Sequence, residues 1–333
     1  MQGASKKQVS AGARGLSPPR ASYVTVSDAA AGQRLDNFLL RLARGVPKSH
    51  LYRIVRSGEV RVNGARARAG QRLQAGDRVR IPPLRTAERP SARVAPAELP
   101  PVLYEDEHIL AVDKPAGLAA HGGSGVSFGL IERVRAARPQ QPFLELVHRL
   151  DRETSGVLLL AKSRRALAGL HEQLRRGQVQ KRYLVLVKGA WHEPRRHVRV
   201  ALRKFLTASG ERRVAAAADG QHAHTVFELR RCFLAGFALL EAQLKTGRTH
   251  QIRVHLAHLG YPIVGDDKYG DFALNKRLAR ADAAPRLTRM FLHAASLQFV
   301  HPITGVPLRI AAPLPPECEA FLSALQAQEA AHA

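Results

Sequence analysis

One mostly polar nonapeptide, residues 148–156, carries the side chains best suited to chemistry. It reads His-Arg-Leu-Asp-Arg-Glu-Thr-Ser-Gly and is flanked by apolar, strand-like runs. A polar loop held between two buried strands is a common position for catalytic groups. Asp151 stands between Arg149 and Arg152, and nearby cations favour an ionised carboxylate. We therefore expect Asp151 to act as a nucleophile or a counter-ion rather than as an acid.

A second polar stretch, residues 246–255, contains two arginines and two histidines. His250 and His255, together with His258, could suggest a metal site, because a helix would bring residues 255 and 258 to one face. No further ligand falls at a known metal spacing, however, and the two arginines would repel a cation. Phosphate contacts or core packing suit these histidines better.

Two reactions could use the nonapeptide. A hydrolytic triad of Ser155, His148 and Asp151 is disfavoured, since all three lie on one loop and no Gly-x-Ser-x-Gly nucleophile elbow is present. Attack by one ionised carboxylate on the sugar or base of a nucleoside uses more of the unusual residues, with arginines in support and an aromatic ring to hold the base. Glycoside hydrolysis would need a second carboxylate, and Glu153 is the only neighbour.

The elements around these stretches alternate between strand and turn signals. Ser163 can cap a helix that ends near Gly177, and Thr304-Gly305 is a hairpin turn. Only two clear helices precede the C-terminal stretch 317–329. We predict an α+β fold with a mixed, mostly antiparallel sheet. The predicted strands are residues 108–113, 143–147, 157–161, 183–187, 225–231 and 237–244.

The region from Arg34 to Ile81 has a different character. Two runs with helical spacing of apolar residues precede short strands at 60–62 and 79–81, separated by turn signals such as Asn63-Gly64. This region contains twelve Lys or Arg residues against three acids. The excess of positive charge on a compact module indicates a polyanionic partner.

Composition narrows the class of protein. Lys and Arg number 52 against 27 Asp and Glu, a formal net charge of +25, which again favours a polyanion. No apolar run approaches the roughly 18 residues of a spanning helix, and no signal peptide is evident. Cys232 and Cys318 are too few and too far apart for a disulfide framework. We expect a soluble, cytoplasmic protein without a membrane partner.

The N-terminal module closely resembles the uS4-type RNA-binding domain over GQRLDNFLLRLARGVPKSHLYRIVRSGEVRVNG. The resemblance implies that its two helices and the following loop dock on structured RNA. The positions that it assigns to RNA contact are Arg34, Lys48, Ser49, Arg53, Arg56 and Asn63.

The rest of the chain resembles the RluA-family pseudouridine synthases. The resemblance rests on LYEDEHILAVDKPAGLAAHGGSG, HRLDRETSGVLLLAKS, KRYLVLVKG, KTGRTHQIRVHLAHLGYPIVGDDKYG and FLHAASLQFVHP, in this order. It implies the pseudouridine synthase fold, and the complete pattern is similar to members that modify large-subunit ribosomal RNA. We expect a disordered basic tail at 1–22, the uS4-type domain at 23–83, a linker at 84–100, the catalytic domain at 101–316 and a C-terminal helix and tail at 317–333.

The resemblance also implies a reaction, the isomerisation of uridine to pseudouridine in RNA, which needs no metal or organic cofactor. We expect the protein to be a monomer, because no protein partner is indicated. Asp151 matches the catalytic aspartate, which either attacks the ribose or assists formation of a glycal. Tyr183 matches the tyrosine that stacks on uracil, and Arg149 matches a residue that fills the gap left by the extruded base. Arg253 matches the partner of the aspartate, with Arg248 as an alternative.

Two other functions stay open at this point. A non-catalytic ribosome-assembly factor would use both domains only to bind RNA. A nucleoside hydrolase acting on small substrates would turn over free uridine and would have no use for the basic module.

Overall fold

The computed structural model describes residues 21–27, 30–43, 45–84, 99–122 and 128–331. Contacts divide the chain into two compact units, Met1–Arg93 and Val94–Ala333. The expected tail at 1–22 and linker at 84–100 lie almost wholly outside the described residues. Within the described ranges, no helix is both long and apolar enough to cross a membrane.

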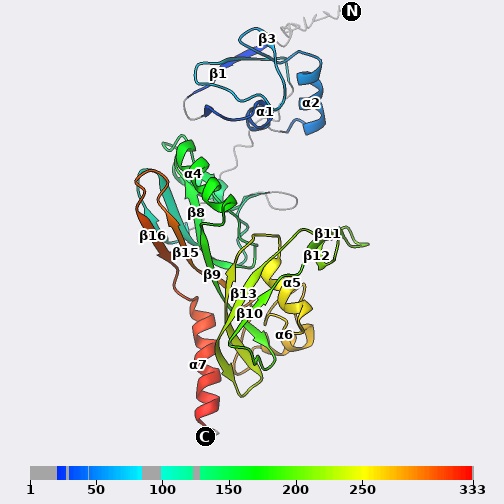
Figure 1. Ribbon diagram of the computed structural model, residues 1–333, viewed down its shortest axis with the longest axis vertical. Helices are drawn as coiled ribbons and strands as arrows, with labels where there is room; N and C mark the ends of the chain where they lie inside the picture. Colours follow the sequence, from blue (N-terminus) through cyan, green and yellow to red (C-terminus); the bar gives the residue numbers. More distant parts are fainter. Residues whose placement is uncertain (1–20, 28–29, 44, 85–98, 123–127, 332–333) are drawn as a thin grey trace, which may run out of the picture. The chain divides into compact units, whose positions relative to one another are not determined.

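The first unit packs two helices against a small sheet with the strand order β1-β4-β2-β3 (Figure 1). Its core is apolar and includes Leu35, Phe38, Leu51 and Ile54. The first strand, β1, was not predicted from the sequence, because a four-residue strand with mostly exposed side chains carries little hydrophobic pattern. The elements are β1 (Ser22–Thr25), α1 (Leu35–Leu42), α2 (Lys48–Arg56), β2 (Arg61–Val62), β3 (Ala65–Arg66) and β4 (Arg78–Ile81).

The second unit is built on a ten-stranded sheet. Its main path is β10-β13-β14-β9-β15-β8-β6-β5, with β16 paired to β15 and β7 paired to β8. The predicted mixed, mostly antiparallel sheet is confirmed. The strands are β5 (Val102–Glu105), β6 (Ile109–Lys114), β7 (Glu145–Leu146), β8 (Ser155–Ala161), β9 (Gln180–Lys188), β10 (Arg195–Val198), β13 (Thr225–Phe233), β14 (Phe237–Leu244), β15 (Leu292–Val300) and β16 (Pro307–Ala311).

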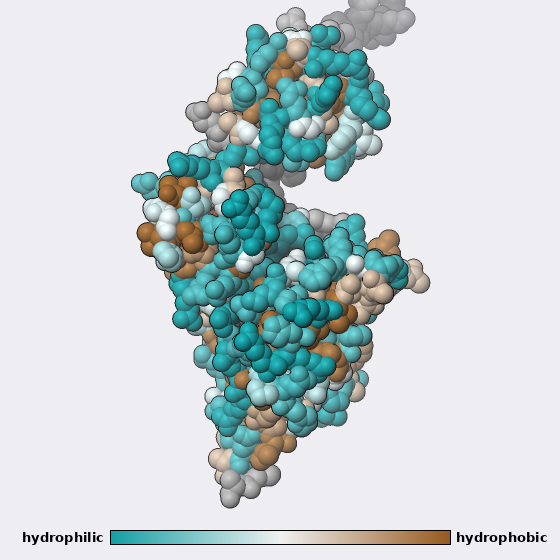
Figure 2. Space-filling view, in the orientation of Figure 1, coloured by the Kyte–Doolittle hydropathy of each residue, from teal (hydrophilic) through white to brown (hydrophobic). Residues whose placement is uncertain are grey.

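A separate hairpin, β11 (Leu202–Leu206) with β12 (Arg212–Ala216), projects from this unit beside α5 in Figure 1. The visible face of each unit is mostly hydrophilic, interrupted by small hydrophobic patches (Figure 2).

Four helices precede the C-terminal helix in the described part of this unit, where the sequence indicated two. The prediction missed α5 because its residues from Gln251 to Leu256 are all buried, so it has no amphipathic period. The predicted strand 143–147 was too long, since only Glu145–Leu146 pairs with β8. The helices are α3 (Leu130–Ala137), α4 (Arg164–Arg175), α5 (Gln251–His258), α6 (Phe272–Leu278) and α7 (Pro316–Ala330).

Among the described strands of the sheet, one pair is parallel, and it includes the last two residues of the nonapeptide. Strands β8 and β15 meet through Ser155 opposite His293 and Gly156 opposite Ala294. Gly156 has φ +107°, and a Cβ added there would lie 2.3 Å from the carbonyl oxygen of Ala294. Only glycine permits this close approach, which fixes where the nonapeptide joins the sheet.

Candidate active site

The nonapeptide forms the connection between β7 and β8, and a buried lysine anchors it. Lys114 Nζ donates hydrogen bonds to the carbonyl oxygens of Pro115, Leu118 and Arg152 at 2.8 to 3.0 Å. Burial lowers the pKa of Lys114 to about 7, whereas three carbonyl acceptors favour the ammonium form. The lysine therefore ties the turn after β6 to the backbone beside Asp151.

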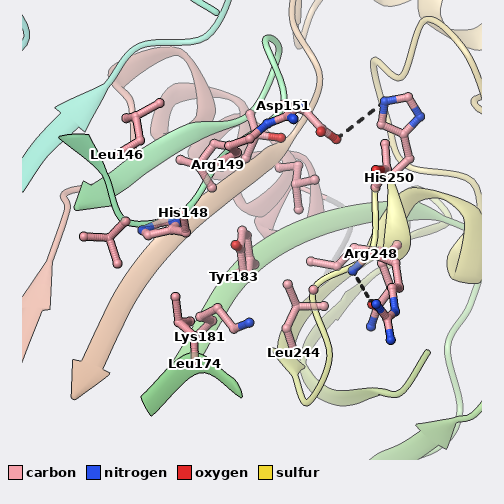
Figure 3. Close-up of a pocket in the computed structure, with 18 of the residues that line it drawn as sticks. Leu146, His148, Arg149, Asp151, Leu174, Lys181, Tyr183, Leu244, Arg248 and His250 are labelled. Atoms are coloured by element: carbon pink, nitrogen blue, oxygen red, sulfur yellow. Dashed lines mark hydrogen bonds and ion pairs between the residues drawn. The ribbon is translucent and has the colours of Figure 1, made fainter. Parts of the chain in front are cut away.

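Asp151 is partly exposed and faces two basic side chains from the second polar stretch. Its Oδ2 lies 3.8 Å from Nη1 of Arg253 and 4.0 Å from Nε2 of His250, and the Asp151 side chain is 28% exposed. Figure 3 shows the side chains of Asp151 and His250 pointing toward one another. The structure thus joins two polar stretches that are about a hundred residues apart in the chain.

Arg253 is held in place by the buried carboxylate of Asp266 and by the exposed carboxylate of Asp267. Its Nε and Nη2 donate to the two oxygens of Asp266 at 2.7 and 2.6 Å, and Nη2 also donates to Asp267 at 3.0 Å. Burial alone would raise the pKa of Asp266, but the hydrogen bonds and charge of Arg253 outweigh it and lower the pKa. Backbone N–H groups of Lys268 and Tyr269 donate to the same carboxylate. The bidentate pair leaves Nη1 directed at Asp151.

A hydrogen-bond chain holds the ring of His250. The backbone N–H of Val214 donates to the hydroxyl of Tyr269 at 2.9 Å, and that hydroxyl lies 2.8 Å from Nδ1 of His250. Burial lowers the pKa of His250, although the charge of Asp151 opposes this shift. The chain orients the ring so that Nε2 faces Asp151.

These groups open onto a pocket of about 680 Å³. Tyr183 lines it from β9 and is buried, and burial together with the charge of Asp151 raises the pKa of its hydroxyl. Lys181 projects from the same strand two residues earlier (Figure 3). The pocket has both apolar and charged lining residues, and its volume lies in the range typical of small-ligand sites. Its apolar lining residues are Leu146, Val147, Leu150, Leu174, Leu244, Ile252 and Leu292.

The three other arginines of the two polar stretches are Arg149, Arg152 and Arg248, and none of them takes the place of Arg253 beside Asp151. Arg149 and Arg248 are exposed and line the pocket, and Arg248 Nε donates to the carbonyl oxygen of His222 at 3.0 Å. Arg253, not Arg248, forms the ion pair with Asp151. Arg152 is exposed and pairs with Glu153 at 2.7 Å.

The hydrolytic triad is not assembled. Ser155 Oγ lies 2.9 Å from Nδ1 of the buried His293 and accepts a hydrogen bond from Arg289 at 2.6 Å. His148 Nε2 instead accepts the backbone N–H of Leu159 at 3.2 Å, and burial lowers the pKa of His148 to about 4.

The three histidines of the second stretch do not share a site either. His255 is fully buried and bonds Thr225 and the carbonyl oxygen of Val200, so it belongs to the core. His250 precedes α5, whereas His258 ends it.

Asp266, Lys181 and Lys114 had no role predicted from the sequence, although all three lie in the motifs that resemble the family. A signal existed for Asp266, since two adjacent aspartates follow an apolar run at residues 263–264. The signals for Lys114 and Lys181 were weaker, because a lysine at a strand end is usually solvated.

In the first unit, the exposed side chains of α2 form a polar and basic face that includes Lys48, Ser49 and Arg56. Arg53 is also exposed and lies 3.9 Å from Glu59. Arg34 and Asn63 are engaged within the unit. Arg34 makes two hydrogen bonds to Asp36 at 3.2 and 2.7 Å.

Asn63 occupies a turn with φ 51° and bonds Asp77 and the backbone N–H of Arg78. Its side chain therefore has a structural task in the turn.

Comparison with known proteins matches both units to known families. The model described as RNA pseudouridylate synthase matches residues 108–258, and that of the S4 domain matches residues 33–79. Ribosomal large subunit pseudouridine synthase C of Escherichia coli (strain K12) is 50% identical over 302 residues, covering 89% of this chain and 94% of that protein. The protein of the same name from Pasteurella multocida (strain Pm70) is 48% identical over 316 residues, covering 93% of this chain and 95% of the relative.

The solved structure of human RNA Pseudouridylate Synthase Domain Containing 4 is also similar. It has a TM-score of 0.54 and 26% identity, and the match covers 68% of this chain and 92% of that one. The chain therefore belongs to the RNA pseudouridylate synthase family, whose members isomerise uridine in RNA, and it carries an RNA-binding S4 domain in its N-terminal part.

Proposed function

We propose that this enzyme isomerises specific uridines of large-subunit (23S) ribosomal RNA, with Asp151 as the catalytic nucleophile. The observation that carries the proposal is the ion pair of Asp151 with Arg253, whose Nη1 lies 3.8 Å from the carboxylate at the mouth of a nucleotide-sized pocket. The ribosomal substrate is supported by the names of relatives that are about half identical over nearly the whole chain.

The reaction breaks the bond between ribose C1′ and uracil N1, rotates the base and joins C1′ to C5. The C5 proton then leaves to water, and N1 takes up a proton. Asp151 either attacks the ribose or assists formation of a glycal. Arg253 orients the carboxylate. Tyr183 stacks on the uracil, and the exposed Arg149 fills the gap that the extruded base leaves in the RNA.

The first unit is the part of the chain that docks on RNA in this proposal. We propose that residues 23–83 dock on structured RNA, that 84–100 link them to the catalytic residues 101–316, and that 317–333 form a C-terminal helix and tail. The exposed basic face of α2 supports this division. We also propose a cytoplasmic monomer without a membrane partner. The proposed contact set is Arg34, Lys48, Ser49, Arg53, Arg56 and Asn63.

A tritium assay tests the function. Large-subunit ribosomal RNA from a strain lacking its own enzyme of this kind is labelled with tritium at uridine C5 and incubated with the protein. Formation of the C1′–C5 bond releases that tritium to water, so we expect release in proportion to modified sites. Binding without release would support the assembly factor, and conversion of free uridine would support the hydrolase.

A further inference from the structure

Lys181 is a cation in the catalytic pocket that the reaction described above does not use. It lies on β9 two residues before Tyr183, and residues two apart in a strand point to the same face. Both side chains line the pocket (Figure 3). At about 3.3 Å per residue, the two Cα atoms are about 6.6 Å apart, so the lysine can reach the edge of a base stacked on the tyrosine.

Within the part of the chain that the structure describes, the ammonium of Lys181 has no carboxylate partner. Among the described residues, no hydrogen bond or ion pair is made by its Nζ, and burial is the only influence that lowers its pKa. A Cβ added at Gly247 would lie 3.4 Å from Nζ, so the ammonium sits close to the backbone that precedes α5. Because desolvating a charge without a partner is costly, this arrangement is explained by a partner that arrives with the substrate.

Lys181 is less exposed than three of the arginines that line the pocket. Arg149, Arg175 and Arg248 are exposed, whereas Lys181 is partly buried. Phosphates of an RNA strand stay in solvent, so exposed arginines at the mouth suit them. A flipped base penetrates further than its phosphates, and Lys181 is placed for the base.

We propose that Lys181 donates a hydrogen bond to a carbonyl oxygen of the target uracil and stabilises the negative charge that the base acquires as it leaves the ribose. This inference rests on the proposed isomerisation and deepens it by adding a catalytic group. When the C1′–N1 bond breaks, its electron pair stays with the uracil and is shared among N1, O2 and O4. The negative charge returns to the Asp151 carboxylate when C5 bonds to C1′. The C5 proton then leaves to water, and N1 takes up a proton. Lys181 keeps its own protons throughout.

Such an interaction is stronger in the transition state than in the ground state, so it accelerates the chemical step more than it tightens binding. Removal of one preorganised donor to a developing anion typically costs about 10²–10³-fold in rate. We therefore expect Lys181→Met to lower the single-turnover rate constant of tritium release by about 100-fold. Its RNA dissociation constant should stay within about threefold of the wild-type value.

The matched control is Lys188→Met at the other end of the same strand. Lys188 is half exposed and pairs with Asp271 at 2.6 Å, away from the pocket. We expect this variant to release tritium at the wild-type rate, and Lys181→Arg, which keeps the charge, to recover part of the loss. An inactive wild-type protein would refute the proposed function itself. An active wild type with an equally active Lys181→Met variant would refute only the role of Lys181.

Substrate RNA containing 5-fluorouridine separates catalysis from folding. Fluorine withdraws electrons and makes the departing base a more stable anion, so the base needs less help from Lys181. After digestion to nucleosides, we expect the rate defect of Lys181→Met in consuming 5-fluorouridine to be smaller than its defect on uridine. An equal defect on both bases, or a loss confined to RNA affinity, would overturn the proposal.

Discussion

The guanidinium of Arg253 can face Asp151 through Nη1 only because Asp266 binds its other two nitrogens and fixes its orientation. Asp266 is 1% exposed and binds Nε and Nη2, which leaves Nη1 for the catalytic carboxylate. Replacing it by alanine would leave a buried arginine with a cavity in place of its main partner. We expect Asp266→Ala to lower the free energy of unfolding by about 3–5 kcal/mol and to slow tritium release.

The buried Trp191 is the sole tryptophan and lies in the second unit, so its fluorescence follows unfolding of that unit in denaturant. The adjacent Asp267 provides the control, because its side chain is 59% exposed and makes one contact to Arg253. Asp267→Ala should cost less than about 1 kcal/mol. Equal losses from the two variants would show that the buried pair has no special importance.

The pH dependence of the rate provides a second test at the residue scale. Burial lowers the pKa of Lys181, so its ammonium loses the proton at a lower pH than an exposed lysine would. Since the charged form is the active one, the single-turnover rate should fall as pH rises through that lowered pKa. Arginine stays charged throughout, so Lys181→Arg should keep its rate at alkaline pH.

Three other titratable groups on the pocket have pKa shifts that differ from that of Lys181 or move them away from the alkaline range. The pKa of Tyr183 is raised, and those of His148 and His250 are lowered. A wild-type rate that stays flat across the alkaline range, or one that falls equally in Lys181→Arg, would contradict the assignment. The remaining charged or titratable side chains on the pocket are His121, Arg149, Asp151, His171, Arg175, Arg248 and Arg253.

The junction of β8 and β15 is the element on which the catalytic loop depends. A methyl group at Gly156 would meet the carbonyl oxygen of Ala294 at 2.3 Å, and the backbone there has φ +107°. We expect Gly156→Ala to lower the free energy of unfolding by about 2–5 kcal/mol and to reduce activity, because the strands must separate. Denaturant unfolding followed by tryptophan fluorescence measures the first effect.

Gly177 offers a matched comparison within the same unit. It also has positive φ, +68°, but nothing lies within 4 Å of an added Cβ. Gly177→Ala should therefore cost only the left-handed backbone penalty, about 1 kcal/mol. A loss as large as that of Gly156→Ala would mean that the contact with Ala294 is unimportant.

Elements with a strong local signal could be predicted from the sequence. The continuous apolar run of β8 and the cap of α4, where Ser163 accepts the backbone N–H of Ala166, are such signals. Helix α5 could not be predicted in this way, because it is buried around its circumference and its polar residues bond inside the protein. The sequence around Arg253 and His255 therefore has no amphipathic pattern from which this helix could be predicted.

The pairing of Asp151 with Arg253 depends on the tertiary structure, and no local sequence pattern predicts it. It was expected only from the resemblance to a family, and the support from Asp266 was not expected at all. Spacing within each polar stretch shows which side chains share a loop, but the strand order that unites the two stretches depends on long-range pairing.

At the scale of the whole molecule, charge predicts how the enzyme responds to salt. The formal net charge is +25, and the first unit has its own core and an exposed basic helix face. If about six phosphates are neutralised, log affinity for RNA should fall with log salt at a slope of about −4.

Removal of residues 1–93 should weaken binding and flatten that slope while leaving a folded catalytic unit. Filter binding across a range of salt concentrations measures both proteins. Equal slopes for the full chain and the shortened protein would contradict a role of the first unit in RNA docking.

The central claim is that Asp151 performs the isomerisation, and the most direct test is tritium release by Asp151→Asn. Asparagine has nearly the same shape but cannot act as an ionised nucleophile. We expect release from labelled ribosomal RNA to stop, with RNA affinity within about threefold of the wild-type value, because Asp151 contributes no positive charge to binding. Release near the wild-type rate would contradict the claim, and a large loss of affinity would show that Asp151 has a structural role instead.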